Sequence, residues 1–199
     1  MSEHIPLIIS VQKLSSQFAA VERYHYRWDT DSRETDTEHS YSVTMLAWML
    51  CSTLDLPLDM GKVLKYSLIH DLPEAYASDV NTFASDQERQ RKIEAEREAL
   101  GRLAIEFEGF DDMLQALTTY EAKDDEEALF VWTVDKMQAL ILGQLDDWRP
   151  FREYGVSYDE FRAKHKQQIE AGSPYCNELY SELLEHCSQS YYDNPDRIQ

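Results

Sequence analysis

Four side chains that can bind a metal ion stand in three separate stretches of this sequence that have helical spacing. They are two histidines and two aspartates: His39, His70, Asp71 and Asp135. Inward-facing side chains on neighbouring helices are a common way to build a metal site in a helical protein. Two imidazoles and two carboxylates suit one divalent transition metal (cobalt, manganese, zinc, iron or nickel) and leave positions for water and substrate. The sequence therefore predicts one such metal without deciding its identity.

Two of these residues stand where an apolar side chain is expected. His39 shares one helical stripe with Val43 and Leu46, and Asp135 shares another with Val131. Alone, such a histidine is more often an ordinary core residue, and such an aspartate can pair with Lys or Arg. A buried carboxylate with no partner costs several kcal/mol, so it needs a cation beside it. The combination of four such residues from three helices favours a metal over the separate explanations.

The adjacency of His70 and Asp71 restricts where the metal can lie. Successive residues of a helix point about 100° apart, so both can reach one ion only from beside the end of the helix. Pro73 disfavours helical dihedral angles at Leu72 and suits the first turn of a new helix. We therefore expect the helix to end or kink at this dipeptide.

The order of these residues resembles the signature of the HD-domain phosphohydrolase superfamily, which is a His, then a His-Asp pair, then a distant Asp. The likeness covers about residues 20–145. It is carried by Thr37-Glu38-His39-Ser40, by the Ser-Leu-Ile-His-Asp-Leu-Pro-Glu of residues 67–74, by Ser78-Asp79-Val80-Asn81-Thr82, and by residues 120–135. Ser78 replaces the usual glycine of the third motif. Within the superfamily the chain is most similar to the 5′-deoxynucleotidase branch and to related small phage and bacterial nucleotide hydrolases.

The resemblance implies an all-α fold, a single HD-type helical bundle over residues 1–199, with added helices over 146–188 and a tail at 189–199. Apolar spacing predicts helices near 8–24, 37–54, 59–71, 84–107, 110–122, 125–148, 157–171 and 175–188. Thr37, Asp59 and the pair Ser157 and Glu160 are predicted to cap three of them. The family also leads us to expect a homodimer.

The resemblance further implies roles for residues beside the metal. Glu74 is expected to handle the attacking water and Asp79 to protonate the leaving oxygen, as catalytic residues. Arg23 and Tyr24 are expected to bind substrate. Alternatives stay open, because Glu74 also suits the first turn of a helix and Tyr24 also suits a core. The alternatives to Arg23 are Arg27 and Arg33, and His25 is an extra imidazole nearby.

Charge and composition exclude several classes of partner. The chain has 19 Lys and Arg against 38 Asp and Glu, a formal net charge of −19. Such a surface repels polymeric nucleic acid and anionic lipid, so neither is an expected partner. The sequence shows no apolar run of membrane length and no secretory signal. Three cysteines without CxxC spacing favour a reducing, cytoplasmic location.

The expected function is hydrolysis of a small-molecule nucleotide. We expect a metal-dependent nucleotide phosphohydrolase that converts (deoxy)nucleoside 5′-monophosphates to nucleoside and orthophosphate. One alternative is a triphosphohydrolase that releases triphosphate, for example from dATP, with Mg²⁺ accompanying the substrate. Another is a nucleotide-binding protein whose site no longer turns over, which the presence of Glu74 and Asp79 disfavours. A purely structural bundle would need the four buried polar residues by coincidence.

Overall fold

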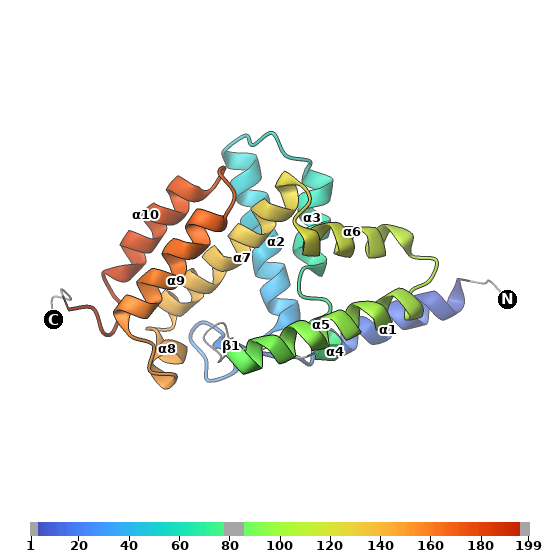
Figure 1. Cartoon of the computed structure of the whole chain (residues 1–199), viewed down its shortest axis with the longest axis horizontal. Coiled ribbons are helices and arrows are strands. Elements are labelled where there is room, and N and C mark those ends of the chain that lie inside the picture. Colours follow the sequence, from blue (N-terminus) through green and yellow to red (C-terminus); the bar gives the residue numbers. More distant parts are fainter. Residues whose placement is uncertain (1–3, 78–85, 196–199) are drawn as a thin grey trace.

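The computed structural model describes residues 4–77 and 86–195, and these residues are mostly helical (Figure 1). In chain order the elements are α1 (Ile5–Phe18), β1 (Glu22–Tyr26), β2 (Arg33–Thr35), α2 (Asp36–Thr53), α3 (Met60–Ile69), α4 (Glu74–Ala77), α5 (Asp86–Glu106), α6 (Asp111–Ala122), α7 (Glu126–Leu145), α8 (Arg149–Glu153), α9 (Tyr158–Ala171) and α10 (Asn177–Ser188). The predicted all-α class is confirmed, with one small antiparallel sheet of β1 and β2 among the described residues. None of the helices described is both long and apolar enough to cross a membrane.

Helices α2, α3 and α7 pack against one another at the centre of the molecule (Figure 1). Fully buried side chains such as Val43, Val63 and Val131 form the contacts of this core. Helices α9 and α10 pack on α7 from one side, and α6 packs on α3. The three central helices, or the turns at their ends, carry the four predicted metal ligands. Burial of their apolar faces therefore also fixes the distance between those ligands.

The segment before α2 is a β-hairpin, where the sequence predicted only helix and loop. The first helix ends at Phe18 instead of continuing to residue 24, and Glu22–Tyr26 pairs antiparallel with Arg33–Thr35. Tyr24 and Tyr26 favour a strand here, because aromatic residues are enriched in strands, but five residues are too few to outweigh helical spacing. Side chains that follow one another in a strand point to opposite faces. The correction therefore separates Arg23 from Tyr24.

Other differences lie at the ends of helices. The helix predicted to reach residue 148 ends at Leu145, and the short helices α4 and α8 were not predicted.

Tyr191, in the segment expected to be a tail, is fully buried and stacks on Phe161 with ring centroids 4.2 Å apart. Its hydroxyl donates to the carbonyl of Val156. An aromatic ring buried in this way anchors the end of the chain to α9.

The start of α2 is fixed by a capping box centred on Thr35 and not on Thr37, the residue predicted as the cap. The backbone N–H of Glu38 donates to the hydroxyl of Thr35, and the Glu38 carboxylate accepts the Thr35 N–H at 2.9 Å. The helix thus begins directly where β2 ends, and Asp36 enters its first turn as a buried residue. The predicted caps at Asp59 and at Ser157 with Glu160 are confirmed.

Replacing Thr35 with Ala should lower the free energy of unfolding by about 1 kcal/mol, because the first turn of α2 loses its cap. Urea denaturation measures the change. Thr53→Ala, at the exposed end of the same helix, is the matched control, because its hydroxyl bonds only to Met49 of its own helix. We expect that control to stay within about 0.5 kcal/mol of wild type. Equal losses in both variants would contradict the assigned cap.

Candidate metal centre

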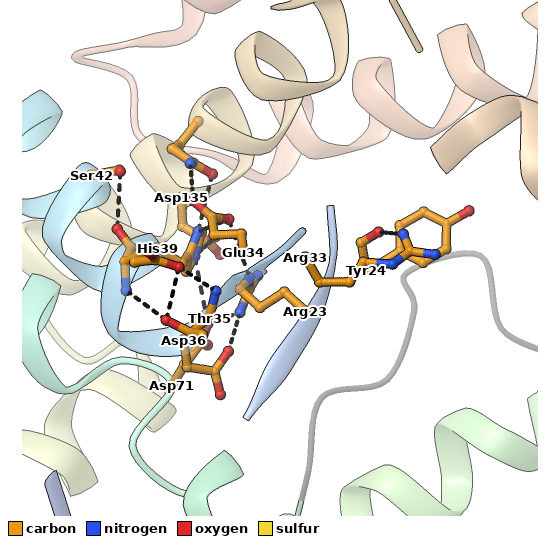
Figure 2. A network of polar contacts seen from close by, with 12 residues as sticks. Arg23, Tyr24, Arg33, Glu34, Thr35, Asp36, His39, Ser42, Asp71 and Asp135 are labelled. Atoms are coloured by element: carbon orange, nitrogen blue, oxygen red, sulfur yellow. Dashed lines mark hydrogen bonds and ion pairs between the residues drawn. The ribbon is translucent and has the colours of Figure 1, made fainter. Parts of the chain in front are cut away.

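The structure brings the four predicted metal ligands together at the meeting point of α2, α3 and α7. Figure 2 shows His39, Asp71 and Asp135 of this group. His39 Nε2 lies 3.0 Å from Asp135 Oδ1 and 3.5 Å from Asp71 Oδ2. His70 Nε2 lies 3.3 Å from the same Asp71 oxygen. Ligand atoms about 2.1 Å from a single ion are themselves about 3 to 3.5 Å apart. The spacing of these atoms therefore fits one shared ion.

The orientation of the two imidazoles also fits a metal. His70 Nδ1 lies 2.9 Å from the carbonyl oxygen of Ser67, which can only accept, so Nδ1 carries the proton. His70 Nε2 is therefore the nitrogen that can bind a metal. It is buried and makes no hydrogen bond among the described residues, although Asp71 Oδ2 lies 3.3 Å away. His39 Nδ1 likewise faces the amide oxygen of Gln138 at 3.0 Å. Metal-binding histidines typically donate from one nitrogen in this way while the other binds the ion.

A change of chain direction lets the adjacent residues His70 and Asp71 face the same point. Helix α3 ends at Ile69 with His70 as its C-cap, and α4 begins at Glu74. Between them the chain turns, with the N–H of Glu74 donating to the carbonyl of Asp71 at 2.8 Å. Pro73 lies in this turn, as the sequence predicted for a helix end.

Arg23, from β1, lies against the carboxylates on one side of the centre (Figure 2). Its Nη1 is 2.6 Å from Asp71 Oδ2, 2.9 Å from Asp36 Oδ1 and 3.8 Å from Glu74 Oε2. On the other side Lys136 Nζ contacts Asp135 Oδ2 at 2.5 Å. With Glu34, the described part of the centre contains more carboxylates than cations. A divalent cation would offset the remaining buried negative charge.

The buried charges shift the pKa values of the predicted ligands His39 and Asp135. Burial lowers the pKa of His39 and so does Arg23, but the hydrogen bond to Asp135 and the nearby carboxylate of Glu34 outweigh both and raise it to about 9. Burial raises the pKa of the Asp135 carboxyl, whereas Lys136 and His39 hold it well below its usual range. Asp135 is therefore ionised as a ligand must be, and a metal that binds His39 has to displace a proton.

Arg23 is the candidate arginine that the structure places at the centre. Arg27 pairs with Glu38 at 2.8 Å, and Arg33 pairs with Glu153 at 3.0 Å. Of these three arginines, the ion pairs of the described residues join only Arg23 to a predicted metal ligand. Of the three arginines, Arg23 therefore has the position that a substrate-binding residue at this centre would need, and its role stays a prediction.

The structure does not bring Tyr24 to the centre. Its side chain lies apart from the metal ligands in Figure 2, and its hydroxyl donates to the carbonyl of Pro150 at 2.6 Å. Its ring packs against Tyr154 with centroids 4.2 Å apart. The predicted substrate-binding pair of Arg23 and Tyr24 is therefore divided between the two faces of β1. Of the open readings for Tyr24, the packing role fits this position.

The other predicted residues have different outcomes. Glu74 is 4% exposed and lies beside Arg23, whereas Asp79 lies outside the described residues. His25 is buried against Phe151, and burial and Arg23 lower its pKa to about 3, so it is neutral. Its ring contacts among the described residues are with Tyr24 and Phe151 and not with a predicted ligand.

Three buried polar residues beside the ligands were not predicted: Glu34, Asp36 and Gln138. Gln138 lies three residues after Asp135 on α7, so helical spacing could have placed both on one face. Glu34 and Asp36 lie at the end of the unpredicted hairpin. Their burial depends on pairing between β1 and β2, and no helical periodicity marks them.

Comparison with known proteins agrees with this geometry. A family model described as the HD domain matches residues 17–177. The chain belongs to the HD domain family. The recognition of the superfamily is thus confirmed, whereas the 5′-deoxynucleotidase branch stays a prediction. No curated protein matches the chain.

Solved structures that resemble this HD domain include the following two. One is a predicted metal-dependent phosphohydrolase from Magnetospirillum magnetotacticum MS-1, with 24% sequence identity, a TM-score of 0.80, and coverage of 96% of this chain and 95% of that one. The other is a conserved hypothetical protein from Pyrococcus furiosus, with 20% identity, a TM-score of 0.60, and coverage of 89% and 99%. At these identities the likeness establishes the shared fold.

Asp135→Ala should abolish stoichiometric binding of a divalent metal while the chain stays folded, because the ion loses a ligand from α7. Elemental analysis after dialysis against Mn²⁺ or Co²⁺, together with circular dichroism, measures both properties. Asp124→Ala removes the same charge from an exposed position just before α7 and should keep wild-type metal content. Full metal occupancy in Asp135→Ala would remove this residue from the ligand set.

Proposed function

We propose that this HD domain is a metal-dependent phosphohydrolase that removes the phosphate from a (deoxy)nucleoside 5′-monophosphate. The observation that carries the proposal is the guanidinium of Arg23, 2.6 Å from the predicted metal ligand Asp71. A divalent ion bound beside it would supply Lewis acidity toward a phosphoryl oxygen and would lower the pKa of a water molecule. The name of the Magnetospirillum relative, a predicted metal-dependent phosphohydrolase, supports the general class.

Arg23 is suited to hold the phosphate next to the ligands. A guanidinium presents five N–H donors in a planar fork that matches phosphoryl oxygens. In this chain the side chain is 12% exposed and is held by Asp36 at 2.9 Å. It is thus placed before substrate arrives, which limits the conformational entropy lost on binding. Arg23 binds and orients the phosphoryl group in this proposal.

Glu74 is suited to accept a proton from the attacking water. It is buried at the start of α4, 3.8 Å from the guanidinium that would hold the phosphate. The water oxygen forms a bond to phosphorus, its proton passes to the Glu74 carboxylate, and the ester P–O bond breaks. The leaving 5′-oxygen takes a proton from Asp79, whose assignment rests on the sequence resemblance.

The balance of charge favours a monophosphate over a triphosphate. In addition to a bound metal ion, the positive charges available would be those of Arg23 and Lys136, which contact predicted ligands among the described residues. These groups can neutralise a monophosphate dianion, whereas a triphosphate carries about two more negative charges and usually needs a larger set of cations. The triphosphohydrolase stays the second candidate, because a triphosphate can bring its own Mg²⁺.

Glu74→Gln should lower kcat by roughly 10² to 10⁴ while metal content and KM stay near wild type, because only the proton acceptor is lost. Steady-state kinetics with the metal-loaded enzyme measures kcat and KM separately. Glu106→Gln is the control, since it disturbs the contact between α4 and α5 through Tyr76 without reaching the centre. A wild-type kcat in Glu74→Gln would leave Glu74 as an ordinary first-turn residue, and lost metal would make it a ligand.

The deciding assay supplies dAMP and dATP separately with Mn²⁺, Co²⁺ or Mg²⁺ and identifies the products. We expect orthophosphate and deoxyadenosine from dAMP. Arg23→Ala should raise KM sharply, whereas Arg33→Ala, on the Glu153 side of the hairpin, should not. Triphosphate released from dATP with dAMP untouched would replace the proposal with the second candidate. A metal-loaded chain that releases phosphate from neither would contradict phosphohydrolase activity on these nucleotides.

A further inference from the structure

A buried carboxylate from the hairpin, Glu34, lies between a predicted metal ligand and the predicted phosphate-binding group (Figure 2). It is 4% exposed and stands on β2, directly before the cap of α2. Its Oε2 is 3.6 Å from His39 Nδ1 and 3.8 Å from Arg23 Nε. It faces the ring nitrogen of His39 opposite the one that faces Asp135. Glu34 thus contacts His39 on the side away from the predicted metal position and does not take the place of a ligand.

Glu34 also fixes the amide group of Gln138. Its Oε1 accepts from Gln138 Nε2 at 3.2 Å, so the amide oxygen of Gln138 is turned toward His39 Nδ1, at 3.0 Å. An amide oxygen can only accept, so Nδ1 must keep its proton and Nε2 must provide the lone pair for a metal. The carboxylate therefore determines, through Gln138, which nitrogen of His39 can bind.

The same carboxylate holds one edge of Arg23. The Nε of the guanidinium faces Glu34 at 3.8 Å, and its Nη1 reaches Asp71 at 2.6 Å. Because the guanidinium is planar and rigid, an anion on the Nε edge restricts the direction of the other nitrogens. Movement of Glu34 would consequently displace both His39, a predicted metal ligand, and Arg23, the predicted phosphate-binding residue.

We propose that Glu34 is the positioning residue that keeps His39 and Arg23 in their relative places, acting on His39 through Gln138. The part that concerns His39 rests on the metal centre alone, and the part that concerns Arg23 rests on the proposed function. Residues that orient metal ligands typically contribute about 10- to 100-fold to metal affinity. A loss of this size is the expected signature of Glu34.

The first test measures the Kd of the metal-free full chain for Co²⁺ by visible absorption. Glu34→Ala should raise this Kd by about 10- to 100-fold, because Gln138 is then free to turn and His39 loses its fixed orientation. The control is Glu153→Gln. Glu153, at the end of α8, forms an ion pair with Arg33 of the hairpin, and breaking this pair should leave the Kd at the wild-type value. A wild-type Kd in Glu34→Ala would overturn the proposal.

The second test exchanges the amide and the carboxylate, so that it does not depend on Glu34→Ala folding well. Gln138→Glu alone sets two carboxylates against each other and should weaken Co²⁺ binding. In the double variant Glu34→Gln/Gln138→Glu, position 138 again accepts from His39 Nδ1 and position 34 becomes the donor. Co²⁺ affinity should be regained, which loss of packing alone would not produce. A double variant that binds no better than Gln138→Glu would overturn the proposal.

Co²⁺ binding separates this inference from the proposed function. If Co²⁺ affinity follows the expected pattern and no phosphate ester is hydrolysed, the proposed function fails while the positioning of His39 by Glu34 stands. In an active enzyme, Glu34→Ala should also raise KM for dAMP, through Arg23. An unchanged KM would overturn the Arg23 part, and a wild-type chain that binds no Co²⁺ would overturn the whole proposal.

Discussion

The arrangement of this HD domain depends on buried negative charge where its three central helices meet. The carboxylates of Glu34, Asp36, Glu74 and Asp135 are buried there, and Asp71 lies beside them partly exposed. Two basic side chains, Arg23 and Lys136, contact this group. Such a cluster is costly unless a cation completes it. The imidazole Nε2 atoms of His39 and His70 face the same point. One divalent ion is the simplest group that satisfies both the charge and the lone pairs.

The hairpin also contributes to the centre, through Arg23 and Glu34. It is short and leads directly into the capping box of α2, so its residues hold fixed positions relative to His39. Within β1, Arg23 contacts Asp71 whereas Tyr24 contacts Pro150 of α8. The positive charge that Arg23 places against Asp36 and Asp71 thus depends on the folding of the hairpin, which lies outside the central helices. A rigid support of this kind is what precise metal and phosphate sites require.

The meeting of the four predicted ligands could be expected from sequence for two reasons. His39 and Asp135 stand in apolar stripes with a spacing of 3.6 residues, and Pro73 indicates a helix end beside His70 and Asp71. The helices themselves followed from the same apolar spacing. Glu34 could not be predicted, because its partner Gln138 is 104 residues away along the chain and their contact exists only after folding. The separation of Arg23 from Tyr24 was missed because five residues of strand carry little periodic signal. Tyr191 was missed because its burial depends on aromatic neighbours from other elements, such as Phe161.

The most direct test of the central claim is a crystal structure of the full chain soaked with Mn²⁺, with anomalous differences collected to locate the ion. The account predicts one peak within bonding distance of His39 Nε2, His70 Nε2 and carboxylate oxygens of Asp71 and Asp135. It also predicts Gln138 and Glu34 behind His39, outside bonding distance. The absence of a peak at full soaking, or a peak bound by other residues with these four unchanged, would contradict the account.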